Sequence, residues 1–349
     1  MGNVPNLRFP EFSGEWENCQ IANILSIGSG RDYKHLEKGN IPVFGTGGYM
    51  TSVNECIYDG ETTFIGRKGS INKPFYYNGK FWTVDTLFYT HSFNKTTPKF
   101  VYCLFQTINW LRYNEASGVP SLSKDTIEKI KVFIPQLDEQ RKISEMLSVI
   151  DERIATQNKI IDKLQSLIKG IRNDVFGKLR KDIGLNAKVG DVLSYEQPQP
   201  YIVEDTEYTA GGTPVLTANK AFVLGYTSET DGIYDKGDCI IFDDFTLDCK
   251  YVDFPFKVKS SAIKILTAKN KELLRYTFEF LKYLDLSTDE HKRHYIAETQ
   301  NQEFILPTTQ IVRTIAHAFS ILSSRMQTIV KQRDMLELQK QYLLRQMFI

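Results

Sequence analysis

The sequence predicts a mixed α/β (α+β) fold in which two globular domains are separated by two long helices packed as an antiparallel coiled coil. Three observations predict it. One helical stretch occurs twice, apolar residues repeat at coiled-coil spacing in both copies, and a region of mixed strand and helix signals precedes each copy. We therefore expect a pseudo-two-fold internal repeat.

The two helical copies run from about Pro135 to Phe176 and from Pro307 to Phe348, and they align without a gap at a constant offset of 172 residues. A helix of this length extends roughly 50 Å at 1.5 Å per residue, which is long for a helix inside a globular core. Two such helices in one chain pack most simply on each other. Identical pairs include Arg141/Arg313, Ile143/Ile315, Arg153/Arg325, Lys159/Lys331 and Asp162/Asp334.

Within each copy the apolar residues recur in steps of three and four, the spacing that keeps one seam against a partner helix. Gln157, Arg333 and Lys340 interrupt this seam, and such polar residues lower stability but fix register or face an absent subunit. A pair of ordinary amphipathic core helices is the alternative. The predicted seam residues are Ile143, Leu147, Ile150, Ile154 and Leu164 in the first copy, and Ile315, Phe319, Leu322, Met326 and Leu336 in the second.

The repeat predicts four segments: a globular domain over 1–135, a helix over 136–180, a second domain over 181–306 and a second helix over 307–349. Gly177 to Gly190 is interpreted as a hinge. We expect turns at Gly45–Gly48 and Asp59-Gly60, and a hairpin at Asn78-Gly79 between two aromatic runs. Strands are expected at 41–44, 62–65, 83–89, 131–134, 239–242, 262–266 and 304–306, and shorter helices at 99–113 and 271–284.

Composition excludes several classes of protein. The chain of 349 residues is 42% hydrophobic, contains no run of 18 apolar residues and lacks a secretory signal pattern, so we expect no membrane span. Five scattered cysteines without a Cys-x-x-Cys pair suit reduced thiols in the cytoplasm. Because the net charge is only +1, any contact with DNA must depend on a local concentration of Lys and Arg.

Motifs for cofactors and metals are weak. The run Phe44-Gly45-Thr46-Gly47-Gly48 suits a tight turn better than a loop that binds adenosyl-methionine, and there is no P-loop and no Asn/Asp-Pro-Pro-Tyr/Phe type catalytic loop. Asp243-Asp244 and the triplet Glu290-His291-Lys292 could form a nuclease metal site, but paired acids in a loop are usually solvated or bond the backbone. His291 and His294 are one helical turn apart, and no third ligand is in view. We therefore predict no catalytic residue and no metal ligand in this chain.

Basic and amide side chains on glycine-bounded loops are the stronger signal. Arg and Lys suit phosphates and guanine edges, and Asn suits adenine. A solvated hairpin tip is the alternative for the loop at Arg67. The predicted DNA-binding residues are Thr46, Tyr49, Arg67, Lys68, Ser70, Asn72 and Lys73 in the first domain, and Asn219, Lys220, Lys292, Arg293 and His294 in the second.

Taken together, these residues resemble the specificity subunit of a type I restriction-modification system. The resemblance covers essentially the whole chain, and the order globule, helix, globule, helix is specific to that family. The segments that carry it are Ile41–Gly48, Ile65–Ser70, Ser121–Ser123, Phe133–Pro135, Glu139–Ile143, Tyr195–Pro198 and Thr217–Lys220.

The resemblance implies two target recognition domains, each reading one half of a split double-stranded DNA sequence, with the helices as a spacer. It implies that the subunit is not catalytic. Partner methyltransferase subunits would bring adenosyl-methionine, and a restriction and translocase subunit would bring ATP-driven cleavage with Mg²⁺. In the second helix Ile311-Val312 stands where Glu139-Gln140 stands in the first, which leaves open whether both copies dock partners equally. A metal-dependent nuclease with a coiled-coil dimerisation arm and a purely structural adaptor are the alternatives.

Overall fold

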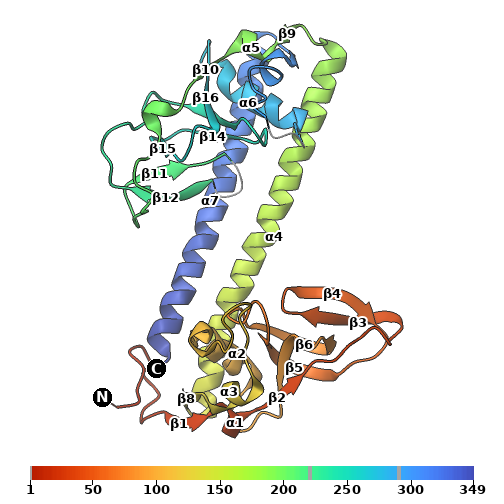
Figure 1. Ribbon diagram of the computed structural model, residues 1–349, viewed down its shortest axis with the longest axis vertical. Helices are drawn as coiled ribbons and strands as arrows, with labels where there is room; N and C mark the ends of the chain where they lie inside the picture. Colours follow the sequence, from red (N-terminus) through yellow and green to blue (C-terminus); the bar gives the residue numbers. More distant parts are fainter. Residues whose placement is uncertain (1, 219–221, 289–291) are drawn as a thin grey trace. The chain divides into compact units, whose positions relative to one another are not determined.

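The computed structural model describes residues 2–218, 222–288 and 292–349. The chain divides into two compact units, one formed by Met1–Asn158 with Lys331–Ile349 and the other by Lys159–Val330. Each unit holds one globular region and a part of each long helix, α4 (Leu137–Asp182) and α7 (Thr309–Met347), coloured yellow-green and blue in Figure 1. The predicted fold class is therefore confirmed.

Unit 1 is built on a six-stranded sheet with the order β2-β7-β5-β6-β3-β4. A small two-stranded sheet, β1 with β8, lies where the globular region leads into α4. The elements are β1 (Glu17–Gln20), α1 (Ile21–Ile24), β2 (Ser26–Ser29), β3 (Lys38–Gly45), β4 (Gly48–Val53), β5 (Tyr58–Gly66), β6 (Phe75–Thr83), β7 (Leu87–His91), α2 (Pro98–Thr107), η1 (Trp110–Tyr113), α3 (Lys124–Lys129) and β8 (Lys131–Ile134).

The predicted hairpin at Asn78-Gly79 and the predicted turn at Asp59-Gly60 are wrong. Both glycines lie inside long antiparallel strands, where Gly60 pairs with Gly79. Each has a positive φ, 146° and 130°, so the two glycines absorb a local distortion of the paired strands without reversing the chain. The chain instead turns after Thr83, which splits the predicted strand 83–89 between β6 and β7.

The predicted helix over 99–113 is two elements. After Thr107 the backbone becomes extended at Ile108, and a 3₁₀ turn follows at Trp110. This break lets the buried Trp110 indole donate a hydrogen bond to the carbonyl of Phe105 at 2.8 Å and pack edge-on against its ring. Satisfying a buried indole N–H outweighs the continued helical pattern.

Unit 2 repeats this plan with shorter strands. Its four-stranded sheet β10-β16-β13-β14 corresponds to β2-β7-β5-β6, and its three-stranded sheet β12-β11-β15 corresponds to β4-β3-β6. The elements are β9 (Ala187–Lys188), α5 (Val189–Val192), β10 (Leu193–Glu196), η2 (Gln199–Tyr201), β11 (Thr213–Leu216), β12 (Val223–Thr227), β13 (Cys239–Asp243), β14 (Cys249–Val252), β15 (Lys257–Val258), β16 (Ile263–Ala268), α6 (Leu273–Leu284), η3 (Thr299–Asn301) and β17 (Glu303–Phe304).

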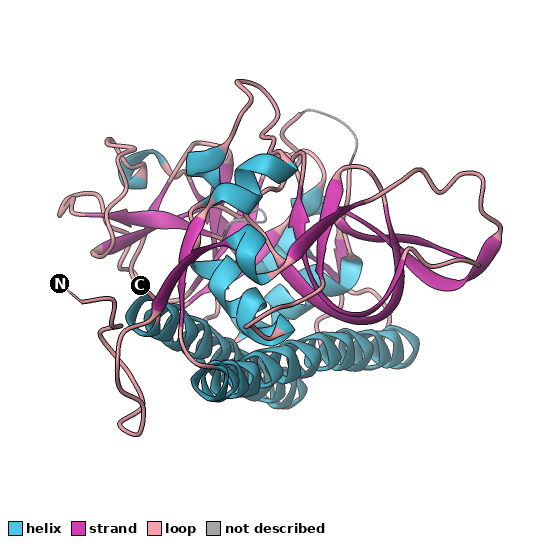
Figure 2. Ribbon diagram, turned by 90° about the horizontal axis from the view of Figure 1, so that it is seen from below, coloured by secondary structure: helices cyan, strands magenta, loops and turns pink. Residues whose placement is uncertain are grey.

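The correspondence extends to strand direction. In unit 1 the first strand of the β3–β4 hairpin pairs in parallel with β6, and in unit 2 the first strand of the β11–β12 hairpin pairs in parallel with β15. Figure 2 shows the strands in magenta and the helices in cyan. The single strand β6 of unit 1 thus corresponds to two separate strands of unit 2, β14 and β15.

The long helices anchor their ends in the cores of the globular regions. In unit 2 the buried ring of Phe176 packs against Tyr276, Phe280 and Tyr283. In unit 1 the ring of Phe348, the residue that aligns with Phe176, stacks on Phe100 at 5.4 Å. The predicted hinge is therefore wrong at its start, since α4 continues through Gly177 to Asp182. Within the described residues, no helix is both long and apolar enough to cross a membrane.

Candidate nucleic-acid interface

A rigid turn between β6 and β7 lies at the centre of the candidate interface in unit 1. The Leu87 N–H donates to the carbonyl of Val84 at 3.0 Å, which closes a β-turn with Asp85 and Thr86 at its tip. Arg67 braces this turn: its backbone N–H donates to the carbonyl of Thr86 at 2.8 Å, and its guanidinium donates to the carbonyl of Asp85 at 3.3 Å. The predicted cationic loop is thus tied to the turn.

The β3–β4 hairpin forms the facing wall. Gly45 pairs with Gly48, so Thr46 and Gly47 make the loop, and the Thr46 hydroxyl donates to the Thr86 hydroxyl at 3.3 Å. Gly48 has a φ of 103°, which favours glycine. Gly47 has no such φ, and a Cβ added there would meet no heavy atom within 4 Å. Neither backbone nor internal packing requires glycine at 47, and its missing side chain leaves room for another molecule.

Between this hairpin and the turn lies an open groove of about 850 Å³. Two predicted residues, Thr46 and Tyr49, line it, and the Tyr49 side chain is 64% exposed. Lys68, Ser70, Asn72 and Lys73 are exposed but do not line the groove. The lining consists of Asp32, Tyr33 and Lys34, residues 45–50, and Val84, Asp85 and Thr86.

Sequence reasoning missed Asp32, Tyr33, Lys34, Asp85 and Thr86. Asp32, Tyr33 and Lys34 come from the loop that precedes β3. Asp85 and Thr86 are distant in sequence from the hairpin, and the parallel pairing of β3 with β6 brings their turn beside it. A parallel pairing leaves no local sequence signature. The one available signal was the position of Asp85 and Thr86 between two strand-forming runs.

In unit 2 a buried carboxylate organises the segment with the predicted cations. Asp244, about 1% exposed, accepts from the backbone N–H groups of His294 at 3.1 Å and Tyr295 at 2.8 Å, and lies 3.6 Å from the Lys264 ammonium. Burial lowers the pKa of that ammonium, and Asp244 opposes this effect. The imidazole of His294 is itself buried, with Nδ1 2.9 Å from the Glu298 carboxylate. The His294 side chain thus lies inside the segment, and its role as a DNA-binding residue stays a prediction.

The other two cations of this segment reach the surface. The Lys292 ammonium lies 2.9 Å from the Glu298 carboxylate with about half of its side chain exposed. The Arg293 guanidinium lies 5.8 Å over the Phe245 ring and 3.4 Å from the Ser261 hydroxyl, and its side chain is 47% exposed. The predicted contacts Asn219 and Lys220 lie outside the described residues.

The carboxylates of the acidic pair Asp243-Asp244 accept hydrogen bonds from backbone N–H groups. Asp243 accepts from the N–H groups of Phe245 and Thr246 at 2.9 and 3.0 Å, while Asp244 holds His294 and Tyr295. Glu290 and His291 lie outside the described residues, and the described part of the chain contains no group of three or more His, Cys, Asp or Glu side chains with metal-site geometry. The two carboxylates therefore have structural roles.

The predicted helix seam is most buried where each helix meets a globular core. Ile143, Leu147 and Phe319 are almost fully buried, whereas Ile154, Leu164, Ile315, Leu322, Met326 and Leu336 are half-buried, with Ile150 at 7% exposure between them. In unit 1 the Lys340 ammonium bonds Asp151 across the helix pair at 2.5 Å, and the Arg333 guanidinium bonds the Asn158 side chain at 3.4 Å. These two interruptions thus pair the helices with each other.

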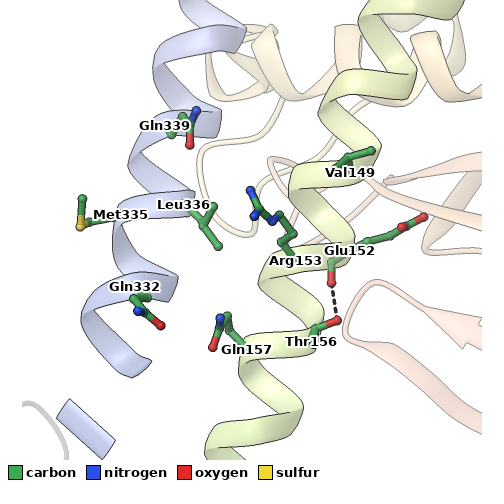
Figure 3. A pocket seen from close by; sticks show the side chains of 9 residues that line it. All are labelled: Val149, Glu152, Arg153, Thr156, Gln157, Gln332, Met335, Leu336 and Gln339. Carbon is green, nitrogen blue, oxygen red and sulfur yellow. Dashed lines mark hydrogen bonds between the residues drawn. The ribbon is translucent and has the colours of Figure 1, made fainter. Parts of the chain in front are cut away.

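Gln157, the third interruption, lines a groove of about 850 Å³ between α4 and α7 in unit 1, seen in Figure 3. Val149 and Met335, 55% and 69% exposed, lie at its edges. The groove is lined by Val149, Glu152, Arg153, Thr156 and Gln157 from α4 and by Gln332, Met335, Leu336 and Gln339 from α7.

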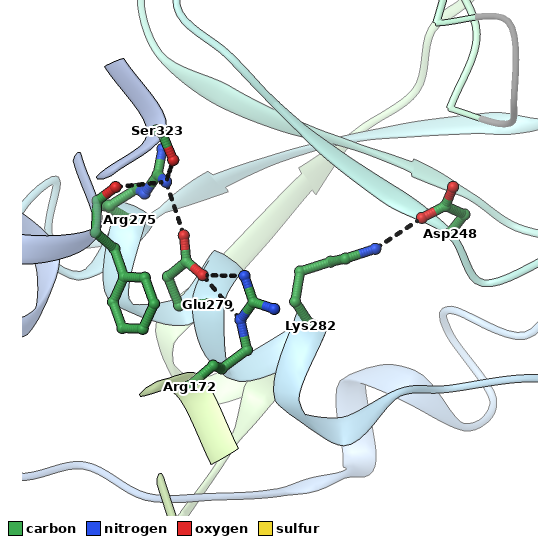
Figure 4. A network of polar contacts seen from close by, with 7 residues as sticks. Arg172, Asp248, Arg275, Glu279, Lys282 and Ser323 are labelled. Atoms are coloured by element: carbon green, nitrogen blue, oxygen red, sulfur yellow. Dashed lines mark hydrogen bonds and ion pairs between the residues drawn. The ribbon is translucent and has the colours of Figure 1, made fainter. Parts of the chain in front are cut away.

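A buried carboxylate on α6 fixes both long helices in unit 2 (Figure 4). Glu279, about 1% exposed, accepts from the Arg172 guanidinium of α4 at 2.7 and 3.0 Å and from the Arg275 guanidinium at 2.7 Å. Arg275 in turn donates to the carbonyl of Phe319 at 3.2 Å and to the Ser323 hydroxyl on α7. No local sequence pattern predicts this network.

The pair Glu139-Gln140 serves the interior of unit 1. Glu139 accepts two hydrogen bonds from the Arg8 guanidinium, at 2.7 and 2.8 Å. The Gln140 side chain accepts from the Thr96 hydroxyl at 2.9 Å and donates to the carbonyls of Lys95 and Pro135. Since both side chains are buried, the different pair in the second copy reflects a different domain junction, and unequal partner docking need not follow.

Comparison with known proteins finds likenesses in both sequence and fold. Residues 13–166 match the family described as the type I restriction modification DNA specificity domain. The chain is 45% identical over 126 residues to the EcoR124I/EcoR124II specificity subunit of Escherichia coli, covering 34% of this chain and 31% of that protein. It is 38% identical over 64 residues to the MjaVIII specificity subunit of Methanocaldococcus jannaschii, covering 18% and 15%. The matched stretches thus span less than a third of each of these relatives.

A solved structure extends the likeness of fold to the whole chain. The crystal structure of the S subunit of a type I restriction-modification system from M. genitalium superposes with a TM-score of 0.72 at 15% identity, covering 99% of each chain. The chain therefore has the fold of this solved S subunit. The likeness in sequence covers residues 13–166, and the likeness in fold covers the whole chain.

Proposed function

We propose that this chain is the non-catalytic specificity subunit of a type I restriction-modification complex, in which each globular region reads one half of a bipartite, asymmetric double-stranded DNA target. The helices set the spacing of the two halves and dock methyltransferase subunits. Adenosyl-methionine belongs to those subunits, and ATP and Mg²⁺ to a restriction and translocase subunit. The observation that carries the proposal is the repeat itself, two domains of one plan with different loops within a DNA-specificity family.

The groove of unit 1 combines the two kinds of contact that DNA recognition needs. Exposed cations, Lys34 in the lining and Lys68 beside it, suit phosphates and fix position without reading sequence. Hydroxyl, phenol and carboxylate groups on the braced hairpin and turn suit base edges. Because the net charge is only +1, the electrostatic attraction to DNA phosphates comes from these local cations.

Removing the cationic loop is expected to weaken DNA binding by the assembled complex. Lys68→Ala removes an exposed charge, so affinity should fall similarly for all sequences and the slope of log affinity against log salt should flatten by about one. Arg67→Ala also loosens the turn, so it should lower discrimination between sequences as well. Fluorescence anisotropy with labelled duplexes at several salt concentrations measures both effects.

Lys129→Ala, at an exposed position of α3, is the matched control and should leave affinity and salt slope unchanged. If the Arg67 and Lys68 variants bind like the wild type at low and moderate salt, the loop is a solvated hairpin tip and the groove is not the interface.

Exposed apolar positions on the helices support docking of partner subunits. Val149 on α4 and Ile321 on α7 align in the repeat and are 55% and 54% exposed. Each is followed at the same spacing by an identical arginine and threonine, Arg153 and Thr156 in α4 and Arg325 and Thr328 in α7. Repeated apolar surface of this kind marks an interaction site, and its recurrence indicates two equivalent docking surfaces.

Placing a charge at these positions should prevent docking. Val149→Asp and Ile321→Asp are each expected to cost the complex one methyltransferase subunit, and the double variant both, because a carboxylate would be buried unpaired at each interface. Native mass spectrometry of purified complexes reads out the stoichiometry. Leu111→Asp, 53% exposed but outside the helices, is the control. Full stoichiometry in the double variant would place the docking surface elsewhere.

A further inference from the structure

We propose that Asp85 reads a cytosine in the half-site recognised by unit 1, its carboxylate accepting a hydrogen bond from the exocyclic N4 amino group in the major groove. This inference rests on the proposed function, because it requires that the groove of unit 1 faces DNA. It assigns one base to one side chain, at a position that sequence reasoning did not select.

The turn presents Asp85 in a fixed geometry. Its backbone is held from three sides: Leu87 to Val84 within the turn, Val84 to Phe44 on the neighbouring strand at 3.1 Å, and Arg67 to Thr86 at 2.8 Å. The side chain is exposed and lines the groove. A side chain on a braced backbone loses little conformational entropy on binding, which is what precise readout requires.

The carboxylate itself is not used by the fold. Among the described residues no donor or cation bonds the Asp85 carboxylate, and Arg67 contacts only its backbone carbonyl. By contrast, the carboxylate of Asp32, which also lines the groove, accepts from the backbone N–H of Lys34 at 3.4 Å. Asp32 therefore has a local structural contact, whereas the carboxylate of the lining residue Asp85 has none among the described residues.

Base chemistry then selects the partner. A carboxylate only accepts hydrogen bonds and is repelled by phosphates, so within a DNA interface it is tolerated where a base presents donors alone. Guanine presents two acceptors in the major groove, thymine presents an acceptor and a methyl group, and adenine pairs its amino donor with an adjacent acceptor, N7. Cytosine presents its N4 donor without an acceptor beside it. The acceptor-only side chain thus fits cytosine best.

The test is Asp85→Asn in the full chain within the intact complex, since the amide keeps the size of the side chain. An amide matches the N6 and N7 pair of adenine. Preference for cytosine over adenine at one position of one half-site should fall roughly ten- to hundredfold, the equivalent of one good base contact. Asp85→Ala should reduce the preference for cytosine at that position without creating a preference for adenine. Binding to duplexes carrying each base there, together with the methylated motif in cells, measures both.

The control Asp125→Asn removes an exposed carboxylate on α3, outside the groove, and should leave the motif unchanged. If Asp85→Asn and Asp85→Ala keep the motif and bind all sequences more tightly, the carboxylate merely repels phosphate and the inference is overturned. If the wild-type complex methylates no two-part motif, the proposed function fails and this inference fails with it. A motif in which the half-site of unit 2 changes instead would also overturn it.

Discussion

Glu279→Ala is expected to destabilise unit 2 by about 3–5 kcal/mol, the range found when one partner of a buried ion pair is removed. Glu279 is about 1% exposed and is the acceptor shared by Arg172 and Arg275, which are each 13% exposed. Without it, two guanidinium groups remain near the junction of α4, α6 and α7 with fewer acceptors. Urea denaturation followed by circular dichroism measures the free energy of unfolding.

The matched control is Glu272→Ala, two helical turns earlier in the chain. Glu272 pairs with Arg313 at 2.7 Å, but both side chains are well exposed, so solvent screens the pair and little stability should be lost. All three tryptophans, Trp16, Trp82 and Trp110, lie in unit 1, so their fluorescence reports that unit separately. If the Glu279 variant has the same free energy of unfolding as the Glu272 variant, the network positions the helices without stabilising the unit.

The long helices and the repeat are predictable from the sequence because their signals are local and periodic. The apolar residues from Ile143 to Phe176 recur at helical spacing, and tertiary packing then determines which of them are buried. Glycines were harder to interpret. Gly48 and Gly79 both have a positive φ, yet Gly48 begins a strand at a hairpin loop and Gly79 lies within a strand, because the strand with which each residue pairs decides its place.

The candidate site was only partly predictable. Basic and hydroxyl side chains on glycine-bounded loops were the basis for predicting Arg67 and Thr46, since those residue types on a turn are themselves the signal. Asp85 has no such signal, because its importance arises from the parallel pairing of β3 with β6. The basic run in unit 2 did not reveal that the imidazole of His294 is buried while the side chains of Lys292 and Arg293 are exposed. The backbone of this segment is held by Asp244, 50 residues away in the sequence, and such a contact leaves no local signal.

Lengthening both helices is expected to lengthen the gap between the DNA half-sites. Four residues inserted after Asn158 and four after Val330 fall at the two boundaries between the units, and these positions are equivalent in the repeat. Each insertion adds about 6 Å at 1.5 Å per residue, close to two base pairs at about 3.4 Å each. Because four residues slightly exceed one turn, the helix faces stay approximately in phase. The loops that read bases are untouched.

Sequencing of methylated bases in cells that carry either the intact subunit or this insertion variant tests the central claim most directly. The account predicts a two-part motif with a fixed gap for the intact subunit, and the same two halves separated by about two more base pairs for the variant. A single continuous motif, altered half-sites, or an unchanged gap in a fully active variant would contradict it.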